Sequence, residues 1–146
     1  MSFVRIWVHV VFSTKNREPW LRKEIRPVVF RHMAENCEQK KIFLQAINGY
    51  EEHVHALVAL GSAQSIAKVV QQLKGESALW INRQNLVPEK FNWQDDYFAV
   101  SVSPDRLDTV RAYIANQEEH HRSRSFQEEV DELFKHYGLR MYADKG

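Results

Sequence analysis

The amino-acid sequence predicts an α+β fold in one domain, residues 1–146, built on a four-stranded antiparallel sheet. Short segments rich in Val, Ile, Phe and Trp, which favour strands, alternate with longer segments whose apolar residues recur every three or four positions. Neither an internal repeat nor a Gly/Ser/Pro-rich linker divides the chain, which is long enough to bury one hydrophobic core. The predicted order is β-α-β-β-α-β, followed by two further helices.

The first strand is predicted at Phe3 to Ser13, where side chains alternate between two faces. One face carries the aliphatic residues Val4, Ile6, Val8 and Val10, and the other carries Arg5, Trp7 and His9. A polar loop, Thr14 to Pro19, follows. A helix is then expected from about Lys23 to Gln39, because apolar residues recur every fourth position: Ile25, Val29, Met33 and Cys37. Pro27 is compatible only with the first turn of that helix.

Two more strands, Ile42 to Gly49 and His53 to Leu60, are predicted to form a hairpin around a turn at Gly49 to Glu52. Ser62 is expected to cap the next helix. The inward face of that helix has mostly apolar residues at helical spacing: Ile66, Val69, Val70, Leu73, Ser77 and Trp80. The fourth strand is predicted at Tyr97 to Ser103, because Pro104 stops it there.

A third helix is expected from about Arg106 to His120, with three apolar residues facing inward: Leu107, Val110 and Ile114. Ser125 and Glu128 have the spacing of a capping box, which predicts a last helix that Gly138 would end. This order of elements is that of the ferredoxin-like or RRM-like split βαβ fold, with helices on one face of the sheet and C-terminal helices added. The other face is expected to be open to a ligand, nucleic acid or a second subunit, and the fold alone does not decide which.

The composition is that of an ordinary globular protein, with 44% hydrophobic and 27% charged residues. No apolar run approaches a transmembrane span, and the apolar start of the chain contains Arg5 and His9, which excludes a signal peptide or membrane helix there. The lone Cys37 excludes an internal disulfide framework and suits a reducing compartment, so a cytoplasmic location is expected.

The net charge of +1 is low for a protein that grips duplex DNA through many phosphates. The charge is uneven, however: residues 15–31 hold six basic side chains against two acidic ones, and residues 118–132 hold six acidic side chains against two arginines. This distribution is compatible with a local basic face beside an acidic segment, and equally with a solvated surface of mixed charge.

His53-Val54-His55 is the first motif that carries chemistry. Residues two apart in a strand project to the same face, so both imidazoles point one way and Val54 points to the core. Imidazole is the commonest protein ligand for divalent transition metals, and two neighbouring rings can share one ion. The alternative is that both histidines are polar surface residues, because a His-x-His triplet also occurs by chance.

Tyr113 and Gln117 are four residues apart in the third predicted helix and are therefore neighbours on its surface. A tyrosine hydroxyl can attack a phosphodiester and hold the DNA end as a covalent ester. Its ordinary pKa of about 10 makes it a poor nucleophile at neutral pH unless a metal withdraws charge from the phosphate. A glutamine carbonyl oxygen beside it can complete a ligand set. Taken separately, each residue is also compatible with packing or surface exposure.

Taken together, these residues resemble the single-tyrosine transposases of the insertion-sequence 200/605 family, which belong to the HUH endonuclease superfamily. The REP-associated tyrosine transposases are similar too. The likeness covers nearly the whole chain. Besides the two motifs above, it rests on further residues along the chain: Val10 to Arg17, Gln72 to Ser77, Phe91 to Gln94, Tyr97, Ser101 to Pro104 and Asn116 to His121. One departure is Glu52 before the first histidine, where aspartate or asparagine is expected.

The resemblance implies a transposase that nicks and rejoins single-stranded DNA at hairpin-marked element ends. Tyr113 would be the nucleophile, leaving a 5′-phosphotyrosine and a free 3′-hydroxyl. His53, His55 and Gln117 would bind Mg²⁺ or Mn²⁺, both of which prefer oxygen ligands. The resemblance also implies a homodimer in which the histidines of one subunit meet the tyrosine helix of the other.

Basic residues that follow the first strand or lie on the central helix are the candidates for phosphate contacts: Lys15, Arg17, Arg22, Lys23 and Lys74. Trp7 is expected either to stack on an unpaired base or to lie in a dimer interface. Two other classes of function stay open at this point. One is a non-catalytic nucleic-acid-binding module derived from such a transposase, and the other is a dimerisation or metal-sensing domain without a DNA role.

Overall fold

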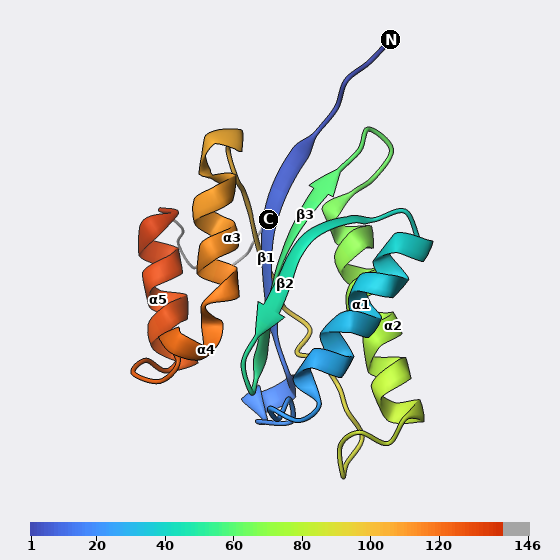
Figure 1. Ribbon diagram of the computed structural model, residues 1–146, viewed down its shortest axis with the longest axis vertical. Helices are drawn as coiled ribbons and strands as arrows, with labels where there is room; N and C mark the ends of the chain where they lie inside the picture. The colour runs from blue at the N-terminus through green and yellow to red at the C-terminus, as the bar shows by residue number, and fades with distance from the viewer. Residues whose placement is uncertain (139–146) are drawn as a thin grey trace.

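The computed structural model describes residues 1–138 and contains the predicted strands in one four-stranded antiparallel sheet (Figure 1). The strands lie in the order β2-β3-β1-β4 and are β1 (Ile6–Ser13), β2 (Phe43–Gly49), β3 (His53–Leu60) and β4 (Phe98–Ser101). The helices are α1 (Arg26–Gln39), α2 (Ile66–Arg83), α3 (Leu107–Ala115), α4 (Gln117–His120) and α5 (Phe126–His136). The α+β fold with C-terminal helices is therefore confirmed. The single-domain prediction extends to residue 146, and its last eight residues lie outside the described part.

Several observed boundaries differ from the predicted ones, and three of the differences have local causes. Ser65, and not Ser62, caps α2, because the Ser65 side chain accepts a hydrogen bond from the Lys68 amide at 3.2 Å. The polar loop after β1 contains a short 3-10 helix, η1 (Lys15–Arg17), and another, η2 (Pro104–Arg106), precedes α3. The single helix predicted over residues 106–120 is divided, because Asn116 (φ −98°, ψ 23°) leaves the helical path between α3 and α4.

One face of the sheet packs against α1 and α2, as predicted. The alternation along β1 and β3 directs aliphatic side chains to this side, where they meet the inward faces of both helices. The main buried cluster includes Val8, Val10, Phe12, Val54, Ala56, Val58, Val29, Met33, Val70 and Leu73. This layer gives β1 and β3 a rigid support from which their other side chains project.

The opposite face is not open, as the sequence analysis expected, but covered by α3 and α5 (Figure 1). Leu57 packs with Val110 and Ile114 of α3, and Val11 packs with Phe126 and Leu133 of α5. The apolar stripes of α3 and α5 are buried when they pack against another apolar surface, and this face of the sheet provides that surface. All eight residues of β3 are consequently buried.

Trp7 lies on this second face, half-buried, with its ring 6.0 Å from that of Phe43 in an edge-to-face arrangement. Within residues 1–138, no helix combines the length and apolar character that a membrane crossing requires.

Candidate metal and nucleophile site

His53 and His55 lie at the first and third positions of β3, directly after the turn from β2. This turn needs glycine at position 49, because a Cβ there would lie 2.1 Å from the His53 carbonyl oxygen. Both imidazoles project to the face covered by α3 and α5, and both are fully buried. β3 therefore places a ring nitrogen of each histidine in an enclosed space.

Each histidine has its Nδ1 engaged by another side chain. His53 Nδ1 lies 2.7 Å from Glu52 Oε1, and His55 Nδ1 lies 2.9 Å from His9 Nε2. Such outer partners orient metal-binding histidines by fixing their tautomer and ring direction. Both Nε2 atoms are thereby left to face a common point.

Burial keeps two of these histidines neutral. It lowers the pKa of His55 to about 4 and, together with the neighbouring His55, lowers the pKa of His9 to about 3. Burial would also lower the pKa of His53, but hydrogen bonds to Glu129 and Glu52 outweigh it and raise that pKa. A neutral imidazole has a lone pair to offer a metal, so the environment of His55 favours ligation.

Tyr113 and Gln117, one turn apart as predicted, approach these histidines from α3 and α4. Gln117 Oε1 lies 2.9 Å from His53 Nε2 and is fully buried. Asn48 of β2 binds the end of α3, where the two helices meet. Its Nδ2 donates hydrogen bonds to the carbonyl oxygens of Ile114 at 2.9 Å and Ala115 at 3.2 Å. The nucleophile candidate and the ligand candidate thus stand side by side on separate helical segments.

Glu129 of α5 occupies the centre of the site and was not anticipated. Its Oε1 lies 3.0 Å from His53 Nε2, 3.2 Å from His55 Nε2 and 3.1 Å from His121 Nε2. Its Oε2 accepts hydrogen bonds from the Tyr113 hydroxyl and from Gln117 Nε2. Although burial opposes ionisation, the bonds to the histidines outweigh it and hold the Glu129 pKa far below its usual range. Burial, and then Glu129 itself, raises the pKa of Tyr113.

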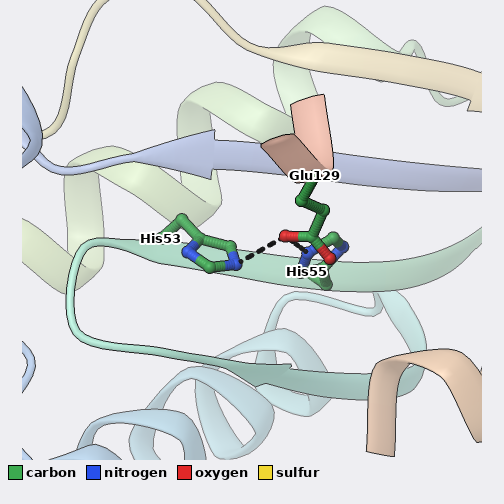
Figure 2. Close-up of side chains that lie close together, drawn as sticks. All are labelled: His53, His55 and Glu129. Carbon is green, nitrogen blue, oxygen red and sulfur yellow. Dashed lines mark hydrogen bonds and ion pairs between the residues drawn. The ribbon is translucent and has the colours of Figure 1, made fainter. Parts of the chain in front are cut away.

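These residues fit a divalent cation. One ligand atom each from His53, His55 and Glu129 lies within 4.8 Å of the others, and Gln117 Oε1 adds a neutral oxygen beside His53. Figure 2 shows both rings projecting from β3 toward the carboxylate of Glu129. A set of two imidazoles and two oxygens suits Mn²⁺ readily and Mg²⁺ when water and phosphate oxygens complete the shell.

One signal in the sequence pointed to Glu129. The inward stripe of α5 runs through Phe126, Val130 and Leu133, and Glu129 stands three residues after the first and four before the last. Burying a carboxylate costs free energy unless the carboxylate is paired with a cation or with hydrogen-bond donors. A carboxylate within an apolar stripe therefore indicates a functional site. Glu52, which stands where aspartate or asparagine is expected before the first histidine, forms a hydrogen bond with His53 Nδ1.

The comparisons with known proteins identify the family of the chain. The family model described as "Transposase IS200 like" matches residues 2–117. The chain belongs to the IS200-like transposase family. The family model spans all four strands and ends at Gln117, so α5 and Glu129 lie beyond it.

Two solved structures share the fold of this IS200-like transposase. A candidate transposase from Deinococcus radiodurans R1 is 23% identical, with a TM-score of 0.63, and the alignment covers 80% of this chain and 93% of that one. A REP-associated tyrosine transposase bound to a REP hairpin is 13% identical, with a TM-score of 0.61, covering 83% of this chain and 72% of that one. No curated protein gives a significant match.

The predicted DNA-contacting residues of this IS200-like transposase are placed around the first loop and on α2. Lys15, Arg17, Arg22 and Lys23 are exposed, and Lys74 is half-buried. Most of these side chains also make contacts within the chain: Arg17 with Gln127 at 2.8 Å, Arg22 with Leu86 O at 3.5 Å, Lys23 with Glu118 at 3.6 Å, and Lys74 with Asp95 O at 2.9 Å. DNA would have to compete with these contacts.

Proposed function

We propose that this IS200-like transposase cuts and rejoins single-stranded DNA, with Tyr113 as the nucleophile. The observation that carries the proposal is the convergence of the Tyr113 hydroxyl and two histidine Nε2 atoms on the single buried carboxylate of Glu129. A nucleophile and a metal-ligand set joined in this way suit phosphodiester chemistry better than a passive binding surface.

In the proposed reaction, Tyr113 Oη attacks the scissile phosphorus and forms an O–P bond, while the bond from phosphorus to the 3′-oxygen breaks. Glu129 Oε2 accepts the hydrogen bond of the hydroxyl and positions it. The phenolic proton passes to water, because the strongly lowered pKa of Glu129 makes that carboxylate a poor proton acceptor. The leaving 3′-oxygen takes a proton from water. The product is a 5′-phosphotyrosine and a free 3′-hydroxyl, and attack by a 3′-hydroxyl on the phosphotyrosine rejoins the strand.

His53, His55, Gln117 and Glu129 would hold the divalent ion, Mg²⁺ or Mn²⁺. Such an ion, when bound, withdraws charge from the scissile phosphate and so assists a weak phenolic nucleophile. Glu52 and His9 would keep the two ring Nε2 atoms directed at it.

We propose stem-loop DNA as the substrate, since a structural relative is bound to a REP hairpin. Lys15, Arg17, Arg22, Lys23 and Lys74 would contact its phosphates. The reaction would take place in the cytoplasm, where a free buried thiol such as Cys37 stays reduced.

A homodimer is proposed from the family resemblance, which also implies active sites shared between subunits; the contacts within one chain favour a different arrangement. Tyr113 and Gln117 contact Glu129 and His53 of their own chain. This cis arrangement supports a site that one chain completes, in place of one shared between subunits.

The deciding experiment uses labelled single-stranded DNA from the gene's own flanks, with Mn²⁺ or Mg²⁺, and compares wild type with Tyr113→Phe. We expect a covalent protein–DNA band from wild type and none from the variant. As a matched control, Tyr97→Phe alters a tyrosine outside the site and should keep the band. A wild-type protein that binds the hairpin without forming a band would favour the non-catalytic binding module.

A further inference from the structure

His121 lies directly after α4 and one helical turn after Gln117. Its amide donates to the Gln117 carbonyl oxygen at 3.0 Å, so the two side chains leave the helix on the same side. The side chain of His121 is 2% exposed, and its Nε2 lies 3.1 Å from Glu129 Oε1. The residue stands beyond the segment that matches the family model. The end of α4 therefore brings a third histidine, in addition to Gln117, to the buried carboxylate.

Two neighbours fix the direction of the His121 ring. Nδ1 lies 2.8 Å from the carbonyl oxygen of Arg124, and because a carbonyl oxygen only accepts, Nδ1 donates. One face of the ring stacks on Tyr50, with the ring centroids 5.0 Å and the planes 22° apart. A backbone carbonyl that binds the far ring nitrogen is a common way to orient a metal-binding histidine. This arrangement directs Nε2 into the site.

The three histidines around Glu129 share one arrangement, although His53 and His55 come from β3 and His121 follows α4. In each ring, Nδ1 is engaged by a neighbouring group and Nε2 faces Glu129 Oε1. The distances from Nε2 to that oxygen are 3.0 Å for His53, 3.2 Å for His55 and 3.1 Å for His121. The ring centroid of His121 lies 4.7 Å from that of His53, compared with 5.1 Å between the two strand histidines. Three imidazole nitrogens thus surround one oxygen atom.

This assembly is costly to bury without a cation. The carboxylate and the three rings lose their contacts with water, and buried charged groups are normally paired or bound to metals. One carboxylate oxygen has two lone pairs, so Glu129 Oε1 cannot accept a full hydrogen bond from all three rings. A divalent ion, by contrast, can take a lone pair from each ring and from the carboxylate at once.

Building on the proposed function, we propose that His121 is a third histidine ligand of the divalent ion and makes the site select Mn²⁺ over Mg²⁺. Mg²⁺ prefers oxygen ligands and gives up its waters reluctantly, whereas first-row transition metals also accept imidazole nitrogen. Each further imidazole therefore disfavours Mg²⁺ more than Mn²⁺. With His121 included, the nitrogen donors outnumber the side chains that supply oxygen, Glu129 and Gln117.

The test titrates the metal-free full chain with Mn²⁺ and, separately, with Mg²⁺ in a calorimeter, without DNA. His121→Gln keeps a group that can donate to Glu129 and removes the imidazole nitrogen. We expect this variant to lower Mn²⁺ affinity at least about tenfold and to change Mg²⁺ affinity little. His120→Gln is the matched control, because the Nδ1 of His120 lies instead 3.3 Å from Arg124 Nη2, and it should keep both affinities. Thermal unfolding checks that both variants fold.

Pulsed electron paramagnetic resonance of bound Mn²⁺ supplies a second readout, since it resolves the couplings of ligating imidazole nitrogens. We expect three imidazoles in wild type and in His120→Gln, and two in His121→Gln. Two imidazoles in wild type would overturn the proposal even if the variant did not fold, and so would a wild type that binds no Mn²⁺. Equal losses of affinity for both metals would make His121 only an orienting partner of Glu129, which also overturns it.

These outcomes are separable from failure of the proposed function, which is judged by the covalent DNA adduct. Three bound imidazoles without any Tyr113 adduct would keep the third ligand and discard the nuclease. An adduct formed by a protein with two bound imidazoles would keep the nuclease and discard His121 as a ligand.

Discussion

Tyr113 donates its phenolic hydrogen bond to Glu129, a residue sixteen positions later and on a different helix. The other oxygen of that carboxylate faces both strand histidines. One side chain thus joins the proposed nucleophile to the proposed metal ligands, and it comes from α5, outside the segment that matches the family model. A change at Glu129 should therefore affect both halves of the site at once.

Glu129→Gln keeps the shape of this side chain and removes its charge. Burial and then Glu129 raise the Tyr113 pKa, so the variant should lower that pKa toward its ordinary value. Mn²⁺ affinity should fall at least about tenfold. Tyrosine ¹³Cζ titration and calorimetry measure the two effects. Asp131→Asn, on the exposed side of α5, is the control, and equal values in all three proteins would show that the carboxylate serves neither role.

Leu57→Ala tests the covered second face of the sheet. Leu57 is fully buried against α3, so its truncation should destabilise the protein by about 2–5 kcal/mol. Leu79→Ala on α2 removes a side chain that is 50% exposed and should cost within about 0.5 kcal/mol. Urea unfolding measures both. Similar small losses would mean that α3 does not stay on the sheet.

His9→Gln should weaken the acid sensitivity of the metal-free protein. Folded His9 has its pKa lowered by burial to about 3, whereas an unfolded histidine titrates near about 6.5. As the pH falls below 6.5, the unfolded chain binds a proton that the folded chain does not, and stability is lost. Between pH 7 and pH 5 this amounts to about 2 kcal/mol.

Urea unfolding in the presence of a chelator, at both pH values, measures this difference. The loss should be smaller in His9→Gln than in wild type by that amount. His53, whose pKa is raised, contributes with the opposite sign in both proteins and cancels in the comparison. Parallel losses would contradict a neutral, buried His9.

A mixture of two inactive proteins distinguishes a cis site from a shared one. Tyr113→Phe lacks the proposed nucleophile, and the double variant His53→Ala/His55→Ala lacks two of the proposed metal ligands. Because Tyr113 contacts Glu129 of its own chain, we expect the mixture to form no covalent adduct. Recovery of the adduct would show that α3 reaches the partner's histidines.

The strands and their pairing were predictable because alternation and turn residues are local signals. His53 to Leu60 was bounded correctly, since Gly49 and the polar turn before it mark its start. The closure of the second face was not predicted. It depends on the surface against which α3 and α5 pack. The apolar residues Leu57 and Ala59, which lie on the same face of β3 as the histidines, were the one indication in the sequence that this face is covered.

The strand histidines, Tyr113 and Gln117 were predicted together, and the structure brings them together. Glu129 and His9 were not assigned roles, because their contacts join residues 74 and 46 positions apart. Spacing along one helix or strand reveals neighbours on that element only. A contact between elements depends on how they pack.

The break at Asn116 determines whether Tyr113 and Gln117 must move together. An unbroken helix would make Tyr113 and Gln117 move as one body, so any swing of a DNA-linked tyrosine would pull a ligand from the metal. Here α3 is tied to the sheet at its end by the two Asn48 hydrogen bonds. Val110 and Ile114 also pack against Leu57, so buried apolar contacts hold α3 to the sheet in addition to these two hydrogen bonds. If Tyr113 carries a severed strand as proposed, a change of angle at Asn116 would let Tyr113 move without moving Gln117.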